Sequence, residues 1–244
     1  MRFDEKEFFS ELNRVFSKNQ LSSLLSRERA EKFAALTEIM LEENEKYNLT
    51  AITEPEKIIL HHYADCAALA AILKKGASIA DVGCGAGFPT LPIAILRPDV
   101  TVLGIDSTAK RINYVNMAAE RLGLSNVSAI TGRAEDLAKG EHRESFDTVT
   151  ARAVANMRVL CELCLPLVKV GGQMIAMKGK NAEFELADSK RAISMLGGKL
   201  SSIENISLSS DKEEISHPLK IITKAAKTPK DYPRAFAQIS KKPL

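Results

Sequence analysis

Three glycines and two carboxylates form the pattern in this sequence that most clearly indicates chemistry. The glycines lie in the run Asp81-Val82-Gly83-Cys84-Gly85-Ala86-Gly87, between an apolar stretch typical of a strand and a helical pattern that begins at Phe88. Side chains at the glycine positions would keep the backbone away from a ligand and would resist turns with positive φ. A second acid, Asp106, follows about 20 residues later, at the end of the next predicted strand. The pattern predicts a loop whose backbone contacts a bound nucleoside.

The spacing of this loop also indicates which nucleoside-containing ligand it binds. An acid at the position of Asp106 would accept hydrogen bonds from two ribose hydroxyls. Dinucleotide-binding loops favour G-x-G-x-x-G with helix amides directed at a pyrophosphate, whereas the spacing here is G-x-G-x-G. Asp81 would repel a pyrophosphate but would attract an amino group, which S-adenosylmethionine carries. The residues therefore favour S-adenosylmethionine as the cofactor, with NAD as the less favoured alternative.

Two further loops supply candidate cofactor contacts. Ala134 and Glu135 follow the third predicted strand, where a backbone amide and an acid could contact the adenine edge. Arg152 follows the fourth predicted strand, at the carboxyl edge of the sheet where ligands of such folds bind. Glu135 could equally be an acid that favours a helix N-terminus, and Arg152 could belong to a surface salt bridge. The contacts predicted from spacing are Asp81, Gly83, Gly85, Gly87, Asp106, Ala134, Glu135 and Arg152.

Motifs that are missing from the sequence narrow the reaction. Enzymes that methylate amino groups of nucleic acids usually carry Asp/Asn-Pro-Pro-aromatic after the fourth strand, where this chain has Thr150-Ala151-Arg152-Ala153. Methylation of pyrimidine carbon 5 needs a nucleophilic cysteine, and no Pro-Cys occurs. A purine ring nitrogen already has a free lone pair, so proximity and alignment with the methyl donor suffice. The adjacent His61 and His62 are expected to have structural or RNA-facing roles.

The elements that must position these residues follow from hydrophobic periodicity. Residues 1–75 repeat apolar positions every three or four residues and predict an extension of three helices. From residue 76, short apolar runs alternate with helical segments, which indicates βαβ units and a parallel sheet. The predicted strands are residues 78–82, 100–105, 127–130, 148–151, 173–177, 202–208 and 219–223. The sequence predicts a Rossmann-like α/β fold with a seven-stranded, mostly parallel sheet over residues 76–224, whose last two strands form a hairpin, and a basic tail over residues 225–244.

Composition and charge limit the class of protein. Of the 244 residues, 45% are hydrophobic and 27% charged, and neither a signal peptide nor a long apolar run occurs, so a cytoplasmic globular protein is expected. Cys161 and Cys164 form a CxxC within an apolar run but lack a second ligand pair, which favours core packing and predicts no metal site.

Residues 220–244 hold seven Lys or Arg and one Asp, a net charge of +6, whereas the whole chain carries +3. This tail is either a phosphate-contacting surface or a solvated segment.

Taken together, these motifs resemble those of the bacterial 16S ribosomal RNA guanine-N7 methyltransferases once called glucose-inhibited division protein B. The matches run from about residue 44 to the terminus: Tyr47-Asn48-Leu49-Thr50, His62-Tyr63-Ala64-Asp65, the glycine loop through Phe88-Pro89, Asp106-Ser107-Thr108-Ala109-Lys110-Arg111, Arg133-Ala134-Glu135, Thr150-Ala151-Arg152-Ala153-Val154-Ala155, Leu165-Pro166-Leu167, Gly171-Gly172, Lys178-Gly179-Lys180, Tyr232-Pro233-Arg234 and Lys241-Lys242-Pro243-Leu244. The chain departs from the family at His61, Cys66, Cys84 and Thr90, and in the tail at residues 235–239.

The resemblance implies methylation at N7 of one guanosine in a loop of 16S rRNA near the decoding site, with S-adenosylmethionine as donor and the rRNA or small ribosomal subunit as partner. It adds Phe88 to the cofactor contacts, and it makes the basic residues Lys178, Lys180 and Arg234 candidates for RNA binding. A monomer is expected. Two alternatives stay open: a methyltransferase acting on a small molecule, and a non-enzymatic RNA-binding or ribosome-assembly protein that retains the cofactor fold.

Overall fold

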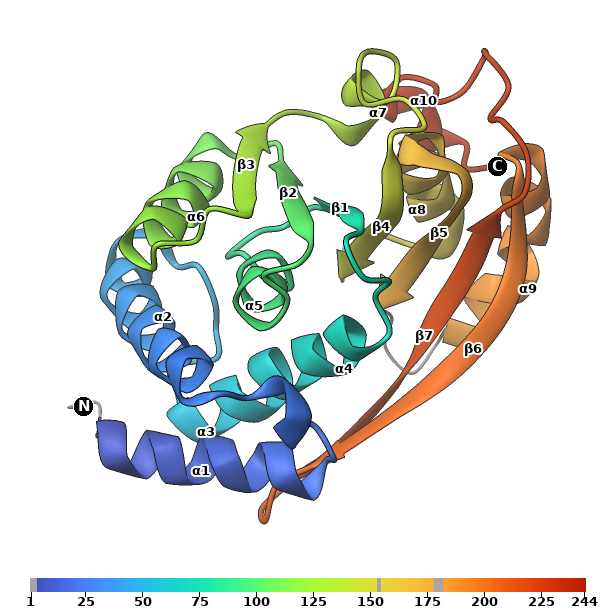
Figure 1. Cartoon of the computed structure of the whole chain (residues 1–244). Coiled ribbons are helices and arrows are strands. Elements are labelled where there is room, and N and C mark those ends of the chain that lie inside the picture. The colour runs from blue at the N-terminus through green and yellow to red at the C-terminus, as the bar shows by residue number, and fades with distance from the viewer. Residues whose placement is uncertain (1–3, 153–154, 178–181) are drawn as a thin grey trace.

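A seven-stranded sheet forms the centre of the molecule, with helices on both faces (Figure 1). The computed structural model describes residues 4–152, 155–177 and 182–244, and the side chains of these residues other than 182–186. The strands lie in the order β3-β2-β1-β4-β5-β7-β6. Their bounds are β1 (Ser78–Val82), β2 (Thr101–Asp106), β3 (Val127–Thr131), β4 (Phe146–Arg152), β5 (Val168–Met177), β6 (Gly198–Ser209) and β7 (Glu214–Lys224). The predicted Rossmann-like fold is confirmed.

Strand direction and order place the ligand-binding edge of this sheet. Strands β1 to β5 pair in parallel, whereas β7 pairs antiparallel with β5 and β6 pairs antiparallel with β7. From β1 the chain proceeds outward to β2 and β3, and then returns to β4 on the other side of β1. In open α/β sheets, ligands bind at the carboxyl ends of the strands where the order reverses. The fold therefore directs the ends of β1, β2 and β4 toward one site.

The helices begin and end where local sequence stabilises their termini. The Asp4 carboxylate accepts hydrogen bonds from backbone N–H groups in the first turn of α1. The Ser26 hydroxyl caps the start of α2, and Asn48, in a left-handed conformation, follows its last residue. The helical bounds are α1 (Glu5–Lys18), η1 (Ser22–Leu24), α2 (Arg27–Tyr47), α3 (Pro55–Ile58), the π-helical turn η2 (Ile59–Ala64), α4 (Asp65–Ala71), α5 (Thr90–Leu96), α6 (Ala109–Arg121), α7 (Ala134–Leu137), α8 (Met157–Cys164), η3 (Leu165–Leu167), α9 (Ala182–Met195) and α10 (Phe236–Lys241).

Two hydrophobic cores lie on opposite faces of the sheet. Successive residues of one strand point to opposite faces, so Ile79 joins one core and Ala80 the other. The first core includes residues of α1, α2, α4, α5 and α6, and the second includes residues of α7, α8 and α9 together with Ile239 of α10. The N-terminal helices thus share one core with a face of the sheet. Cys161 and Cys164 are fully buried in the second core.

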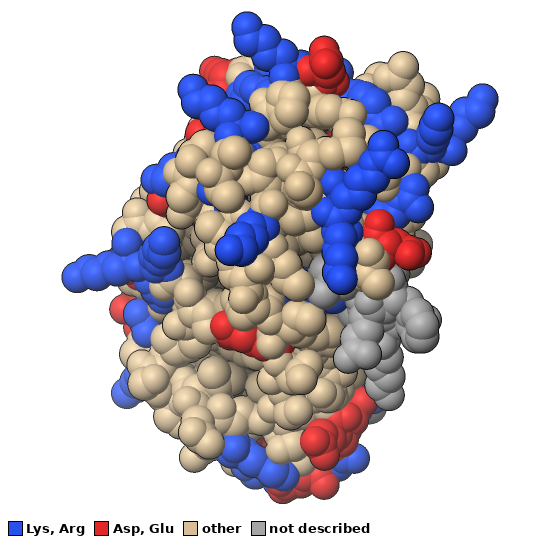
Figure 2. Space-filling view, turned by 90° about the vertical axis from the view of Figure 1, so that its right-hand side faces the viewer, with Lys and Arg blue, Asp and Glu red and all other residues tan. Residues whose placement is uncertain are grey.

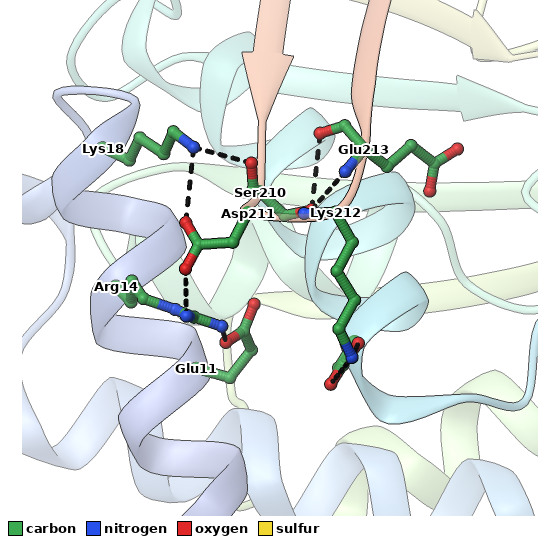
Figure 3. Close-up of polar contacts among 8 residues, drawn as sticks. Glu11, Arg14, Lys18, Ser210, Asp211, Lys212 and Glu213 are labelled. Carbon is green, nitrogen blue, oxygen red and sulfur yellow. Dashed lines mark hydrogen bonds and ion pairs between the residues drawn. The ribbon is translucent and has the colours of Figure 1, made fainter.

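Two late segments of the chain reach back to earlier elements. The tip of the β6–β7 hairpin meets α1, where Arg14 and Lys18 contact Asp211 and Ser210 (Figure 3). The C-terminal tail lies beside α7 and α8 at the opposite end of the molecule (Figure 1). Among the helices that the structure describes, none combines the length and the apolar character of a membrane-spanning segment.

Candidate functional site

A cavity of about 420 Å³ opens at the carboxyl ends of β1 to β4. Six of the predicted cofactor contacts line it, namely Gly83, Gly85, Asp106, Ala134, Glu135 and Arg152. The other lining residues are Leu49, Val82, Ala86, Ile105, Ser107, Thr108, Arg111, Gly132, Arg133, Ala155, Leu163 and Phe236. The predicted contacts Asp81, Gly87 and Phe88 are not among the described lining residues. Residues distant in the sequence therefore converge on the edge that the topology singles out.

The glycine loop is held against the end of β2 by its own backbone. The N–H groups of Gly83 and Cys84 both donate to the Ile105 carbonyl, at 2.7 and 3.1 Å. Gly85 has a φ of +55° and lines the cavity, so its missing side chain permits both the turn and a close approach by a ligand. Gly87 has a φ of +82°, a conformation that side chains rarely adopt, and an added Cβ atom would also lie 2.7 Å from the end of the Leu91 side chain on α5.

Asp106 is placed to bind a diol. Its Oδ1 accepts a hydrogen bond from the Thr108 N–H at 2.8 Å, and its Oδ2 accepts one from the Gly85 N–H at 3.1 Å. The Arg111 guanidinium lies 3.5 Å from Oδ2. A carboxylate has about four lone-pair positions, so both oxygens can still accept from ribose hydroxyls. The buried carboxylate is oriented before any ligand binds.

Asp81 lies beneath the glycine loop and is fully buried. Its Oδ2 accepts a hydrogen bond from the Thr90 hydroxyl at 2.6 Å, whereas Oδ1 has no hydrogen-bond partner in the described structure. Burial raises the pKa of this carboxyl to about 6, although the hydrogen bond from Thr90 opposes the change. A buried acceptor without a partner is costly, and a cationic amino group approaching through the glycine loop would relieve that cost. Its predicted contact with the cofactor stays a prediction.

Arg152 joins the cavity to the N-terminal helices. Its Nη1 donates to the His61 carbonyl at 3.1 Å and lies 3.5 Å from the Asp65 carboxylate. Its Nη2 lies 3.2 Å from Nδ1 of His62. The same Nδ1 lies 3.2 Å from the His61 carbonyl oxygen, so the Arg152 guanidinium and this carbonyl hold the imidazole ring from two sides. Burial and the charge of Arg152 lower the pKa of His62 to about 3, so this ring stays neutral at physiological pH.

Phe88 supports this arrangement from behind the cavity. The His62 and Phe88 rings stack with centroids 4.2 Å apart and planes inclined by 16°. The Arg152 guanidinium lies 5.6 Å from the centroid of the Phe88 ring. Asp65, which pairs with Arg152, also contacts Nε2 of His217 on β7 at 2.5 Å. The structure thus gives His62 and Phe88 positions that orient Arg152, and a direct contact between Phe88 and the cofactor stays a prediction.

The prediction from sequence missed several residues of the cavity wall. Leu49 lies in the Tyr47-Asn48-Leu49-Thr50 motif. This motif is among the matches to the family, but the sequence predicted no function for it. Phe236 comes from α10, and the guanidinium carbon of Arg133 lies 4.9 Å from its ring centroid. Nothing in local spacing relates residue 236 to residue 133, so only the folded chain shows their contact.

The three predicted RNA contacts have different outcomes. Lys178 and Lys180 lie outside the described residues. Arg234 forms a two-pronged pair with Glu162, with its Nε 2.8 Å from Oε1 and its Nη2 2.6 Å from Oε2. This geometry anchors the tail, and an RNA contact by Arg234 stays a prediction. Two other cations of the basic segment, Lys220 and Lys224, are fully buried.

The residues present fit S-adenosylmethionine. Asp106 can hold the ribose, and Glu135 with the Ala134 backbone lies where the adenine edge would be contacted. The free oxygen of Asp81 suits an ammonium group behind the loop. No cluster of three or more His, Cys, Asp or Glu suited to a metal ion occurs among the residues that the structure describes. The donor set matches a cationic nucleoside.

Comparison with known proteins agrees with this chemistry. The family model described as rRNA small subunit methyltransferase G matches residues 29–215. Proteins named Ribosomal RNA small subunit methyltransferase G are 50% identical in Clostridium perfringens strain 13, over 90% of this chain and 92% of that one, and 44% identical in Lactobacillus acidophilus, over 90% and 93%. TYW2 from M. jannaschii, solved in complex with AdoMet, has the same fold with a TM-score of 0.54 at 17% identity, covering 66% of this chain and 75% of that one.

The family model and the named relatives establish the type of reaction. The chain is an S-adenosylmethionine-dependent methyltransferase, as the glycine loop and the second acid predicted. The family model covers well over half of the chain, and the relatives match along nearly their whole length. The chain belongs to the rRNA small subunit methyltransferase G family.

Proposed function

We propose that this enzyme methylates N7 of a single guanosine in 16S ribosomal RNA. The family and the relatives named for small-subunit rRNA support an rRNA substrate. One observation of the site supports the choice of N7: the side chains of the described cavity lining that could accept a proton are the carboxylates of Asp106 and Glu135, and we assign both to the cofactor. With both carboxylates on the cofactor, the described lining leaves no side chain to take a proton from the methyl acceptor.

The proposed chemistry needs no base. S-adenosylmethionine supplies a methyl group activated by a sulfonium. The N7 lone pair forms the new N–C bond while the C–S bond breaks and its electron pair returns to sulfur. Positive charge passes from sulfur to the guanine ring, and no proton has to leave. Ring-nitrogen methylation therefore depends on proximity and in-line orientation, which a cavity fixed by Asp106, Glu135 and Arg152 can provide.

The charge of the surface supports an RNA partner. Lys and Arg side chains gather on the upper part of the face shown in Figure 2, at the height where Figure 1 places α10 and the tail. In the tail, Lys227, Lys230, Lys241 and Lys242 are exposed. Cations near an RNA backbone gain affinity by releasing counterions, and this gain weakens with added salt. We propose that these lysines contact rRNA phosphates, and that the enzyme acts as a monomer in the cytoplasm.

Methyl transfer to defined substrates tests this function. The enzyme would be incubated with methyl-labelled S-adenosylmethionine and either deproteinised 16S rRNA or 30S subunits from a bacterial strain lacking the family enzyme. Nucleosides from the digested RNA would be separated and identified by mass spectrometry. We expect label in 7-methylguanosine, at about one methyl group per RNA. Label on another atom, or in neither substrate, would overturn the proposal.

Replacing exposed lysines distinguishes an RNA substrate from a small molecule. Truncation of residues 225–244 would leave Glu162 without its partner, so it would test stability as well as RNA binding. Changing Lys227, Lys230, Lys241 and Lys242 to Gln instead removes four exposed charges. We expect weaker RNA binding and a shallower dependence of log affinity on log salt, with unchanged affinity for S-adenosylhomocysteine. An unchanged salt slope would exclude these lysines from the RNA interface.

A further inference from the structure

The C-terminal tail contributes an aromatic side chain to the cofactor cavity. Phe236, at the start of α10, lines the cavity together with Arg133, Ala134 and Glu135. Its side chain is 38% exposed, which makes it one of four exposed large hydrophobic residues in the described structure. An aromatic ring left partly in water has unused apolar surface. A ring with that surface on the wall of a nucleoside-binding cavity can pack against a base.

The neighbours of Phe236 connect it to the adenine side of the cavity. The Arg133 guanidinium carbon lies 4.9 Å from the ring centroid, in cation–π contact. Arg133 directly precedes Ala134 and Glu135, the residues placed to contact the adenine edge. The ring therefore contacts the loop after β3, which we expect to contact adenine.

The tail holds this ring on an anchored scaffold. Ile239 of α10 is fully buried in the second core. Before α10, Arg143 donates to the Tyr232 carbonyl at 2.8 Å and Arg234 pairs with the fully buried Glu162. After α10, Arg158 donates to the Pro243 carbonyl at 2.5 Å. With contacts on both sides of the helix, Phe236 is positioned before a ligand arrives, which limits the entropy lost on binding.

We propose that Phe236 is the aromatic wall of the cofactor site against which the adenine ring packs, so that the C-terminal tail completes the S-adenosylmethionine site. This inference rests on cofactor binding and is independent of which rRNA atom is methylated. Stacking of a base on an aromatic side chain is worth about 1–3 kcal/mol, equivalent to about a 5- to 150-fold change in affinity.

Titration with S-adenosylhomocysteine alone tests the proposal without RNA. For Phe236→Ala we expect the Kd to rise at least about fivefold, and for Phe236→Trp we expect it to stay near the wild-type value. Ile203→Ala is the matched control, because Ile203 is a similarly exposed apolar residue on β6. Thermal melts would show that all three variants fold. An unchanged Kd for S-adenosylhomocysteine in Phe236→Ala would overturn the proposal. If the Kd stays unchanged while the KM for RNA rises, the proposal is also overturned, because the Phe236 ring would then contact the methyl-accepting base and not adenine.

A tryptophan at the same position supplies a second readout. The chain contains no tryptophan, so Phe236→Trp places the only indole in the cavity wall. We expect its fluorescence to change saturably with S-adenosylhomocysteine and with adenosine, because both carry the base. Ile203→Trp should show no change. A cavity tryptophan that responds to neither ligand would contradict packing against adenine. Failure of rRNA methylation with these responses intact would overturn only the proposed substrate.

Discussion

The hairpin tip and the C-terminal tail attach to the rest of the molecule in opposite ways. At the tip, Lys212 pairs with Glu56 at 2.7 Å and Arg14 pairs with Asp211, and all four side chains are at least 41% exposed (Figure 3). In the tail, Arg234 pairs with Glu162, whose side chain is fully buried. Exposed ion pairs contribute about 0–1 kcal/mol, whereas breaking a buried pair costs about 3–5 kcal/mol.

The hairpin tip makes surface contacts, whereas the tail contributes to the cavity and to a hydrophobic core. The tip holds the N-terminal helices at the surface, and none of the described cavity-lining residues comes from residues 209–214. The tail contributes Phe236 to the cavity and Ile239 to the second core. Substitution of an anchoring residue of the tail should therefore cost more stability than substitution of an ion-paired residue of the tip.

The largest effect is expected from Arg234→Ala. This variant leaves the Glu162 carboxylate buried without its cationic partner, which should lower the free energy of unfolding by about 3 kcal/mol. Arg234→Lys keeps the charge but loses the two-pronged geometry, so its loss should be smaller. Chemical denaturation of both variants provides the measurement. If Arg234→Ala lowers the free energy of unfolding by less than about 1 kcal/mol, the Arg234–Glu162 pair contributes no more than the exposed ion pairs of the tip.

A pH-dependent effect is expected from Lys224, which donates to the Leu165 carbonyl at 2.6 Å. Burial lowers its pKa to about 8 from 10.5, although the nearby Glu144 opposes the change and Arg143 adds to it. Between these pH values the unfolded chain holds a proton that the folded chain has released, so folding stability rises with pH. Relative to Lys224→Met, the wild type should gain about 3 kcal/mol from pH 8 to 10.5. Denaturation curves that keep a constant difference across this range would contradict the lowered pKa.

The smallest effect is expected at the hairpin tip. A double-mutant cycle of Arg14→Ala and Asp211→Ala should give a coupling free energy of about 0.5 kcal/mol, which decreases with added salt. The exposed i,i+4 pair of Arg27 and Glu31 offers a matched cycle within one helix. A coupling free energy above about 2 kcal/mol would show that this ion pair contributes more than an exposed surface pair does.

Local patterns predicted the sheet well but left its ends short. Strand β1 matches the predicted residues 78–82, since an apolar run ends at the glycine loop. The prediction began β5 at residue 173, whereas the strand starts at Val168, because pairing of Val168 with Phe146 extends it. The hairpin strands also run beyond their predicted bounds, since they stabilise each other along their whole length. Periodicity detects the apolar centre of a strand, and its ends depend on partners.

The site was predictable where chemistry follows the strand ends directly. Gly83, Gly85, Asp106, Glu135 and Arg152 all line the cavity, because parallel strands bring their carboxyl ends together. The role of the tail was not predictable. Arg234 meets Glu162, 72 residues earlier in the chain, through side-chain packing that no local spacing encodes. The basic tail was expected to be either solvated or RNA-binding, and the structure shows one of its cations, Arg234, paired with the buried Glu162.

Hydrogen exchange with and without S-adenosylhomocysteine tests most directly the claim that the carboxyl-edge cavity and the tail form one cofactor site. We expect slower exchange on binding in residues 83–88, 106–111, 132–137 and 234–240, and no change in residues 209–214 at the hairpin tip. Protection at the tip with none in the tail would contradict this claim.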